Sequence, residues 1–397
     1  MLQIDALNGK YIGSDGNVLF SPRCPDFRFC NTSSHADTSG PGKKLGSMKP
    51  DICLYANDHL QHVTVGPKRS KRKKKVEDTD VSTSLKDAGD AGMPTSVQLT
   101  DMSYVALFFE IKKSKSLDFF IDPPPGADRS EWRFVLHDRN INSEAYRTGL
   151  LNLGQNVSYA IETCKRQYRE CVYSVSMSGS WARLIRWDRA GAIVSDSFNI
   201  RKDPKILCEF FWCFSALSDA GRGYDLTVQP AAPEDELLFY NAIEEHVRTQ
   251  AHTDDIDALE KLVQEHYEKG AVTMIFLLTS ESTTTTPTAE RLLVSRPVSI
   301  PLSLAGRGTR TYWAVRKDAT PHQVVLLKDT WSYDIPGGDD GPQLKREGDV
   351  LEHLNAMGVR NVPHVVYHQD VPRIDVFHEP KLTPSGIVYG SYGGEHH

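Results

Sequence analysis

"SYVALFFEIKKS", residues 103–114, decides the fold of the first part of this chain. Every residue from Val105 to Phe109 is apolar, so a strand formed here would be apolar on both faces. Such a strand needs a neighbour on each side and a covering layer on each face, which places it in the middle of a sheet. Its far end carries Glu110 and Lys112, so a carboxylate and an amine reach the edge of the predicted sheet.

The segments around this strand predict a domain of mixed α/β structure. Short apolar runs between turn residues are typical of strands, and apolar residues three or four apart are typical of helices. The predicted elements are strands at 49–58, 171–179 and 181–189, and helices at 149–170 and 203–221. We expect the aromatic side chains of the second helix to lie in the core; these are Phe210, Phe211, Trp212 and Phe214.

Three polar residues of this domain form a known pattern. Asp51 stands in a Pro-Asp pair at one strand, and Glu110 and Lys112 form Glu-x-Lys at the next. The arrangement resembles the PD-(D/E)XK nuclease-like fold. That resemblance implies Mg²⁺ held by Asp51 and Glu110, with Lys112 positioning or activating the attacking water. The alternative is a core strand that ends in a solvated charged segment.

A polar insertion, residues 63–97, separates the two carboxylates in the sequence. It has almost no apolar residues, so we expect it to be disordered. Residues 67–76, "PKRSKRKKKV", contain seven Lys or Arg and resemble a nuclear localisation signal, which implies an import receptor as partner. Binding to nucleic-acid phosphates is a weaker alternative, because no aromatic residue is interleaved for base stacking. A solvated loop without a partner is the third interpretation.

Composition sets the broad class of the protein. A length of 397 residues with 39% apolar residues predicts two domains with real cores. The seven cysteines form no Cys-x-x-Cys pair, so we interpret them as reduced intracellular thiols. No stretch approaches membrane-spanning length, and no membrane partner is expected. We therefore predict a nuclear or cytoplasmic protein.

The second part of the chain contains "HQVVLLKDTW", residues 322–331, which reads as a short buried strand. A buried Lys328 would need an anionic partner. A loop with Gly306 and Gly308 precedes it, and a helix with Glu347 follows. In a protein kinase small lobe, glycines approach the ATP phosphates, a strand lysine contacts them, and a helix glutamate holds that lysine. A solvent-facing lysine on an edge strand is the alternative.

Several segments resemble the fungal-type protein kinase domain proteins over roughly residues 45–372. They are "WDRAGAIVSDSFNI", "EFFWCFSALSDAGRGYDLTV", "VLLKDTW", and "EGDVLEHL" with "GVRNVPHVV". The resemblance implies a kinase-like fold and Ser/Thr phosphorylation of a protein substrate, which it does not identify, with ATP and Mg²⁺ as cofactors. Gly306, Gly308 and Lys328 would then bind ATP, and Glu347 would be the lysine's partner.

The catalytic half of a kinase is not found in this sequence. A kinase needs an aspartate in an HRD-type loop and another in DFG, and neither motif appears after residue 354. We therefore expect a kinase-like protein that does not transfer phosphate as written. The alternatives are a non-catalytic binding or scaffold protein, and a Mg²⁺-dependent nuclease acting through Asp51, Glu110 and Lys112.

Together these patterns predict a mixed α+β protein, with a restriction-nuclease-like domain followed by an incomplete kinase fold. The predicted parts are a nuclease-like α/β domain at 1–228, a helical linker with a polar loop at 229–290, a domain similar to a kinase small lobe at 291–380, and a disordered tail at 381–397.

Overall fold

The computed structural model confirms a mixed α+β protein with several sheets and six α-helices among the residues it describes. Those residues are 11–12, 18–20, 24, 26–37, 47–65, 97–129, 132–135, 142–252, 255–278, 289–331 and 346–368. They belong to two compact units, residues 1–343 and residues 344–397. The basic run 67–76 and the predicted tail 381–397 lie outside the described residues.

The first sheet has β7 (Val105–Lys112) in its middle, as the apolar run predicts. It pairs antiparallel with β4 (Ile52–Ala56) on one side and parallel with β8 (Cys171–Ser178) on the other. The strand order is β10-β9-β8-β7-β4-β3, with β11 also paired to β9. The remaining strands are β3 (Phe27–Asn31), β9 (Trp181–Asp188), β10 (Gly191–Val194) and β11 (Phe198–Asn199).

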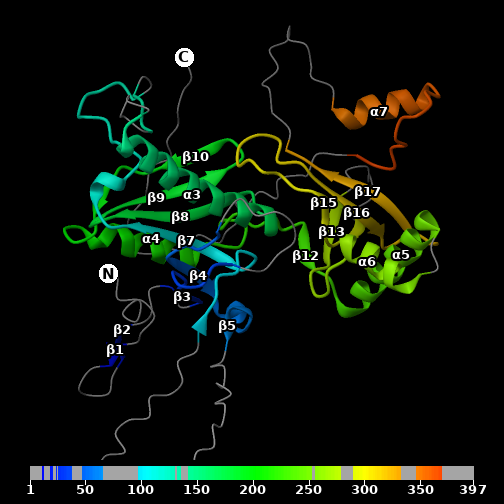
Figure 1. The fold of residues 1–397 in the computed structure, drawn as a ribbon, viewed down its shortest axis with the longest axis horizontal. Helices are drawn as coiled ribbons and strands as arrows, with labels where there is room; N and C mark the ends of the chain where they lie inside the picture. Colours follow the sequence, from blue (N-terminus) through cyan, green and yellow to red (C-terminus); the bar gives the residue numbers. More distant parts are fainter. Residues whose placement is uncertain are drawn as a thin grey trace, which may run out of the picture. The chain divides into compact units, whose positions relative to one another are not determined.

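Helices cover both faces of this sheet (Figure 1). Helix α3 (Glu144–Arg166) joins β7 to β8, because two parallel strands need a long crossover connection. It shares a core with Phe108 of β7, whereas α4 (Pro204–Ala216) shares a second core with Phe109. Both predicted helices are confirmed, with α3 beginning earlier and α4 ending earlier than the sequence indicates.

The aromatic residues of α4 do not all point into the core. Phe211 and Phe214 are each 1% exposed, and Phe211 packs edge-on against Phe29 with ring centroids 5.0 Å apart. Trp212 is 64% exposed, so the prediction of a core role for it is wrong. A helix face buries positions three and four apart, and Trp212 follows Phe211 by one residue, which turns it toward solvent.

A second sheet has the order β12-β13-β14-β16-β15, with β17 paired to β16. Its strands are β12 (Val228–Pro230), β13 (Thr273–Leu278), β14 (Ala289–Val294), β15 (Pro297–Ser299), β16 (Arg310–Arg316) and β17 (Gln323–Asp329). Helices α5 (Pro233–Ala251) and α6 (Ile256–His266) pack on it through a shared core that includes Phe239, Val263 and Leu293. The predicted helical linker therefore contributes both covering helices and strand β13 to this folded part.

Strand β17 is less buried than its apolar sequence indicates. It pairs with β16 on one side. Leu326 is 58% exposed, and Lys328 is exposed as well. The prediction of a buried strand is therefore wrong. Because Lys328 is exposed, the argument that its burial requires an anionic partner does not apply.

The remaining described elements are short, apart from one helix in the second compact unit. Near the N-terminus β1 (Tyr11–Ile12) pairs antiparallel with β2 (Val18–Phe20), and β5 (Thr64–Val65) pairs with β6 (Val97–Gln98). The short helical elements are η1 (Asn57–His59), α2 (Leu60–Val63) and η2 (Lys115–Leu117), and the second unit contains α7 (Glu347–Ala356). None of the helices in the described ranges is long and apolar enough to cross a membrane.

Phe211→Ala should destabilise the protein by about 3–5 kcal/mol, because it leaves a cavity between α4 and the sheet. The neighbouring Trp212→Ala is the matched control, and it should change the free energy of unfolding by less than about 0.5 kcal/mol. Chemical denaturation of both variants measures this difference. Equal losses of stability would contradict the assigned orientation of α4.

Candidate functional sites

The first candidate site lies where β4 and β7 meet. Asp51 directly precedes β4, and its backbone amide donates to the Phe109 carbonyl at 3.1 Å. The Asp51 carboxylate accepts a hydrogen bond from the Ile111 amide at 2.7 Å. These two contacts fix Asp51 beside the end of β7, so the long insertion between the two strands does not separate Asp51 from Glu110.

Glu110 and Lys112 point to the same face of β7, because side chains two apart share a face of a strand. The Lys112 amine donates to Glu110 Oε1 at 2.6 Å and to Gln155 Oε1 at 2.8 Å. Gln155 lies on α3 and in turn donates to the Tyr159 hydroxyl at 2.7 Å. The structure thus brings the three predicted residues together, and Tyr159 is a member that sequence reasoning missed.

Burial dominates the electrostatics of this carboxylate–lysine site. It raises the pKa of Glu110 to about 7; the hydrogen bond from Lys112 opposes the rise and the nearby Asp51 charge adds to it. Burial also raises the pKa of Asp51, against the Ile111 amide and the charges of Lys112 and Lys49. Asp51 and Glu110 therefore lie close together in a partly buried environment, and the nearby lysines do not fully offset the cost of ionising both carboxyl groups.

The donor set of the site fits a hard divalent cation. Glu110 Oε2 is buried and has no hydrogen-bond partner among the described residues. Magnesium is commonly held by one or two carboxylates together with waters and substrate phosphates, which Asp51 and Glu110 could provide. Within the described ranges no group of three or more His, Cys, Asp or Glu side chains could hold a metal ion. Asp51 and Glu110 thus offer two carboxylates, fewer protein ligands than the four of a closed structural metal centre.

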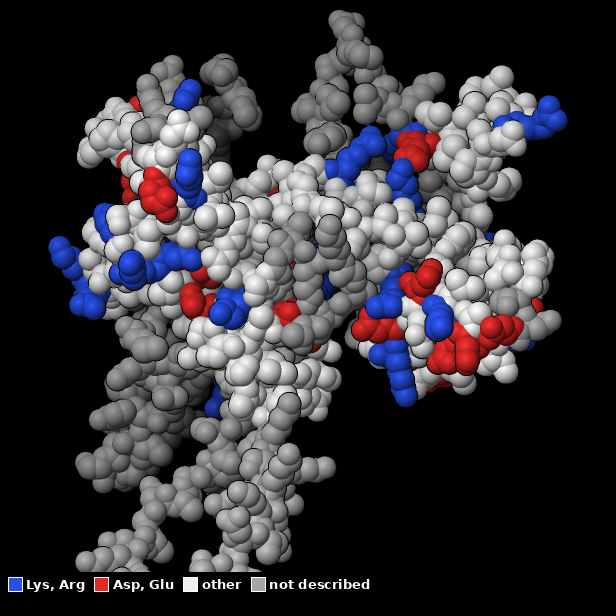
Figure 2. All heavy atoms as spheres, viewed as in Figure 1, with Lys and Arg blue, Asp and Glu red and all other residues white. Residues whose placement is uncertain are grey.

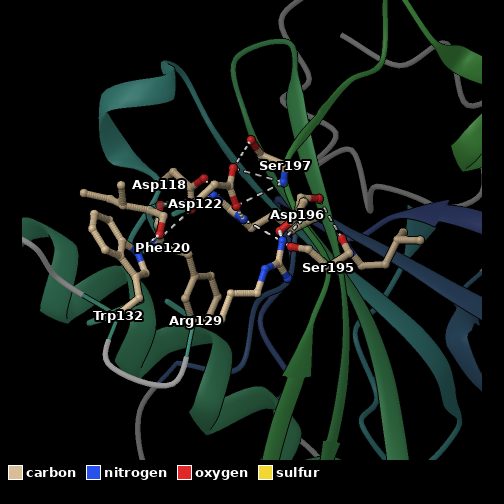
Figure 3. A network of polar contacts seen from close by, with 11 residues as sticks. Asp118, Phe120, Asp122, Arg129, Trp132, Ser195, Asp196 and Ser197 are labelled. Carbon is tan, nitrogen blue, oxygen red and sulfur yellow. Dashed lines mark hydrogen bonds and ion pairs between the residues drawn. The ribbon is translucent and has the colours of Figure 1, made fainter. Parts of the chain in front are cut away.

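A second polar network joins the segment that follows β7 to β9 and to the residues just before β11 (Figure 3). The Arg183 side chain, 3% exposed, donates to Asp118 at 2.8 Å and also pairs with Asp122. Asp122 accepts from the Ser197 hydroxyl at 2.6 Å. Burial tends to raise the pKa of Asp122, but the hydrogen bonds from Arg183 and Ser197 outweigh it, so its pKa is lowered. The network holds the segment after β7 against β9 and β11.

The residues of the predicted ATP site lie on the second sheet and on α7. Lys328 of β17 stands opposite Thr311, near the start of β16. Gly306 and Gly308 lie in the loop between β15 and β16, with φ of 100° and 52°, values that favour glycine. Glu347 is the first residue of α7 in the other compact unit, and its ion pair with Lys328 stays a prediction.

Surface charge differs between parts of the molecule. Acidic side chains, with some basic ones between them, gather over α5 and α6 (Figure 2). The exposed acidic residues of these helices are Glu234, Glu245, Asp257, Glu260 and Glu265. Negative charge there repels phosphate backbones, so this face does not favour nucleic acid.

The raised pKa of Glu110 predicts a pH-dependent stability. Between about pH 4.5 and 7 the folded state binds more protons than the unfolded state, so the stability falls as pH rises through this window. Glu110→Gln should gain stability relative to the parent protein as pH increases from 5 to 8, by at most about 1.4 kcal/mol per pH unit. Denaturation at several pH values measures the difference, with the exposed Glu265→Gln as control. A difference that does not change with pH would contradict the assignment.

Comparison with known proteins identifies the family. The family model described as fungal protein kinase matches residues 128–379, which is more than half of the chain. Comparisons with curated proteins and with solved structures gave no match. The matched range includes Gly306, Gly308, Lys328 and Glu347, and it begins after β7. The chain therefore belongs to the fungal protein kinase family.

Proposed function

We propose that the second sheet binds ATP as the nucleotide-binding part of a protein kinase. One observation carries this proposal: β16 pairs antiparallel with both β15 and β17, and Lys328 lies on β17. The loop that joins β15 to β16 contains Gly306 and Gly308, and residues 303–309 of it are called the glycine loop below. In protein kinases a glycine-rich loop joins two strands over the phosphates, and the next strand carries the phosphate-contacting lysine. Membership in the kinase family supports the same assignment.

The roles in this ATP site follow from the chemistry of each residue. The Lys328 side chain is exposed, so its amine is accessible to the α- and β-phosphates of a nucleotide that binds from solvent. The adjacent Asp329 is engaged by Arg310, whose Nε donates to it at 3.0 Å. Glu347 is assigned as the carboxylate that holds Lys328 when nucleotide is bound, as the family resemblance implies. Transfer to a Ser or Thr hydroxyl is the family's chemistry, and we assign to these residues the binding step alone.

Lys328→Met should weaken the binding of Mg²⁺–ATP at least about tenfold, equivalent to about 1.4 kcal/mol, because it removes the cation at the phosphates. Lys261→Met is the matched control, since Lys261 is exposed on α6. Calorimetric titration with Mg²⁺–ATP gives both dissociation constants. Unchanged affinity in Lys328→Met would refute the assigned role.

A second candidate function is metal-dependent hydrolysis of a phosphodiester at the carboxylate–lysine site. It is favoured by the unpartnered, buried Glu110 Oε2 beside Asp51. The strand order, with β7 parallel to β8 across α3, is consistent with the nuclease-like fold that the sequence resembles. Exposed Lys49 lies close enough to lower the pKa of both carboxylates, which adds positive charge where an anionic substrate would approach.

The residues of the carboxylate–lysine site would have different roles in such a reaction. Asp51 and Glu110 would hold the cation, which would supply Lewis-acid stabilisation of a phosphate oxygen. Lys112 is held between Glu110 and Gln155, so its amine has a fixed position beside the carboxylates. From there it can orient a water molecule or neutralise a phosphate oxygen. Tyr159 fixes Gln155 and so acts through it.

Mn²⁺ should stabilise the protein against unfolding by about 2.7 kcal/mol at one hundred times its dissociation constant. Asp51→Asn should abolish this gain, because the amide keeps the acceptor for Ile111 but loses the charge. The exposed Asp58→Asn should keep it. Thermal unfolding with and without Mn²⁺ is the readout, together with cleavage of plasmid DNA. Equal stabilisation of Asp51→Asn and the parent would exclude a metal at this place.

A further inference from the structure

The glycine loop of the second sheet is attached to the first sheet. Arg189 lies in the turn between β9 and β10, and its side chain donates to the carbonyls of Ser303 and Leu304 at 3.1 and 3.2 Å. The Arg189 carbonyl accepts the Gly306 amide at 3.0 Å. The Leu304 side chain, 6% exposed, belongs to the same core as Trp187 of β9. The loop is thus held by three hydrogen bonds and one buried side chain.

At Gly308 the Arg189 guanidinium occupies the place that a side chain would take. A Cβ atom at this position would lie 2.5 Å from Arg189 Cζ and 2.6 Å from Nε. Its φ of 52° also lies in the left-handed region, where a side chain costs energy. A residue larger than glycine at position 308 would therefore collide with the Arg189 guanidinium.

The charge of Arg189 makes this contact unusual. Arg189 is 8% exposed. Asp329 is close enough for its charge to act on Arg189, but within the described ranges the ion pair of Asp329 is with Arg310. Its Nε has no hydrogen-bond partner among those residues. A buried cation that forms no ion pair among the described residues is costly, and the two loop carbonyls are the acceptors that its Nη1 contacts.

We infer that Arg189 is a positioning residue: its side chain holds the glycine loop, residues 303–309, against the first sheet, and while the loop is held there the Arg189 backbone carbonyl withholds the Gly306 amide from nucleotide phosphates. The consequence for ATP rests on the proposed function. A loop that binds phosphate through its backbone amides needs those amides free, and Gly306 has already donated its own. Release of the loop from Arg189 is then a step that precedes or accompanies tight nucleotide binding.

Hydrogen–deuterium exchange of the full chain tests the holding contact directly, without nucleotide. Arg189→Met keeps the apolar stem and removes the Nη1 group that donates both side-chain hydrogen bonds to the loop. The loop should then open more often, so the amides of residues 303–309 should exchange at least about tenfold faster. Arg186→Met is the matched control: Arg186 is an arginine of the adjoining strand β9, and its ion pair is with Asp188. Unchanged exchange of the loop in Arg189→Met would overturn the inference.

Mg²⁺–ATP affinity, measured on the same proteins, tests the consequence. Arg189→Met should bind ATP several-fold more tightly than the parent, and Arg186→Met should bind as the parent does. Faster exchange with equal or weaker ATP binding would overturn the withholding role. Faster exchange with no ATP binding by any of the proteins would support the holding contact and refute the proposed function, so the two failures are distinguishable.

Gly308→Ala provides a second test in case Arg189→Met does not fold, and the two substitutions together form a double-mutant cycle. Gly308→Ala should speed exchange of the loop because its Cβ displaces the guanidinium, and this variant is informative even if Arg189→Met does not fold. Where both fold, Gly308→Ala should cost less stability in the Arg189→Met background than in the parent, because only the backbone strain remains. Additive effects of the two substitutions would contradict the contact.

Discussion

The burial of β7 on both faces is the constraint on which the first part of the structure depends. Phe108 contributes to the core with α3 and Phe109 to the core with α4, so the strand is stable only while both helices are in place. The same strand ends in Glu110 and Lys112. Because its register with β4 is fixed, Asp51 must lie beside them. The packing of apolar residues thus sets the distance between charged ones.

The two sheets are linked through the glycine loop. Leu304 enters the core of the first sheet, and Arg189 reaches back to the carbonyls before Gly306. Both Arg189 and the loop lie inside the range that matches the fungal protein kinase family. The loop proposed to face nucleotide phosphates is therefore held by the turn after β9 of the first sheet, within the same compact unit.

Sequence patterns were sufficient where local periodicity and burial agree. The central strand and the helix at α3 follow from apolar spacing. The residues of the Pro-Asp and Glu-x-Lys pattern lie close together in the structure, and their role at a metal stays a prediction. The pattern failed where an apolar run lies on an edge strand: β17 looks buried in the sequence, yet Lys328 is exposed. Arg189 could not be found, since its partners lie more than a hundred residues away and a lone arginine in a turn has no distinguishing spacing.

Covalent labelling tests most directly whether Lys328 lies beside the phosphates of bound ATP, as proposed. An acyl-phosphate derivative of ATP transfers its acyl group to an amine next to the bound phosphates, and peptide mass spectrometry locates the modified residue. Lys328 should be labelled, and excess ATP should suppress this labelling. Labelling confined to other lysines, or labelling of Lys328 that ATP does not reduce, would contradict it.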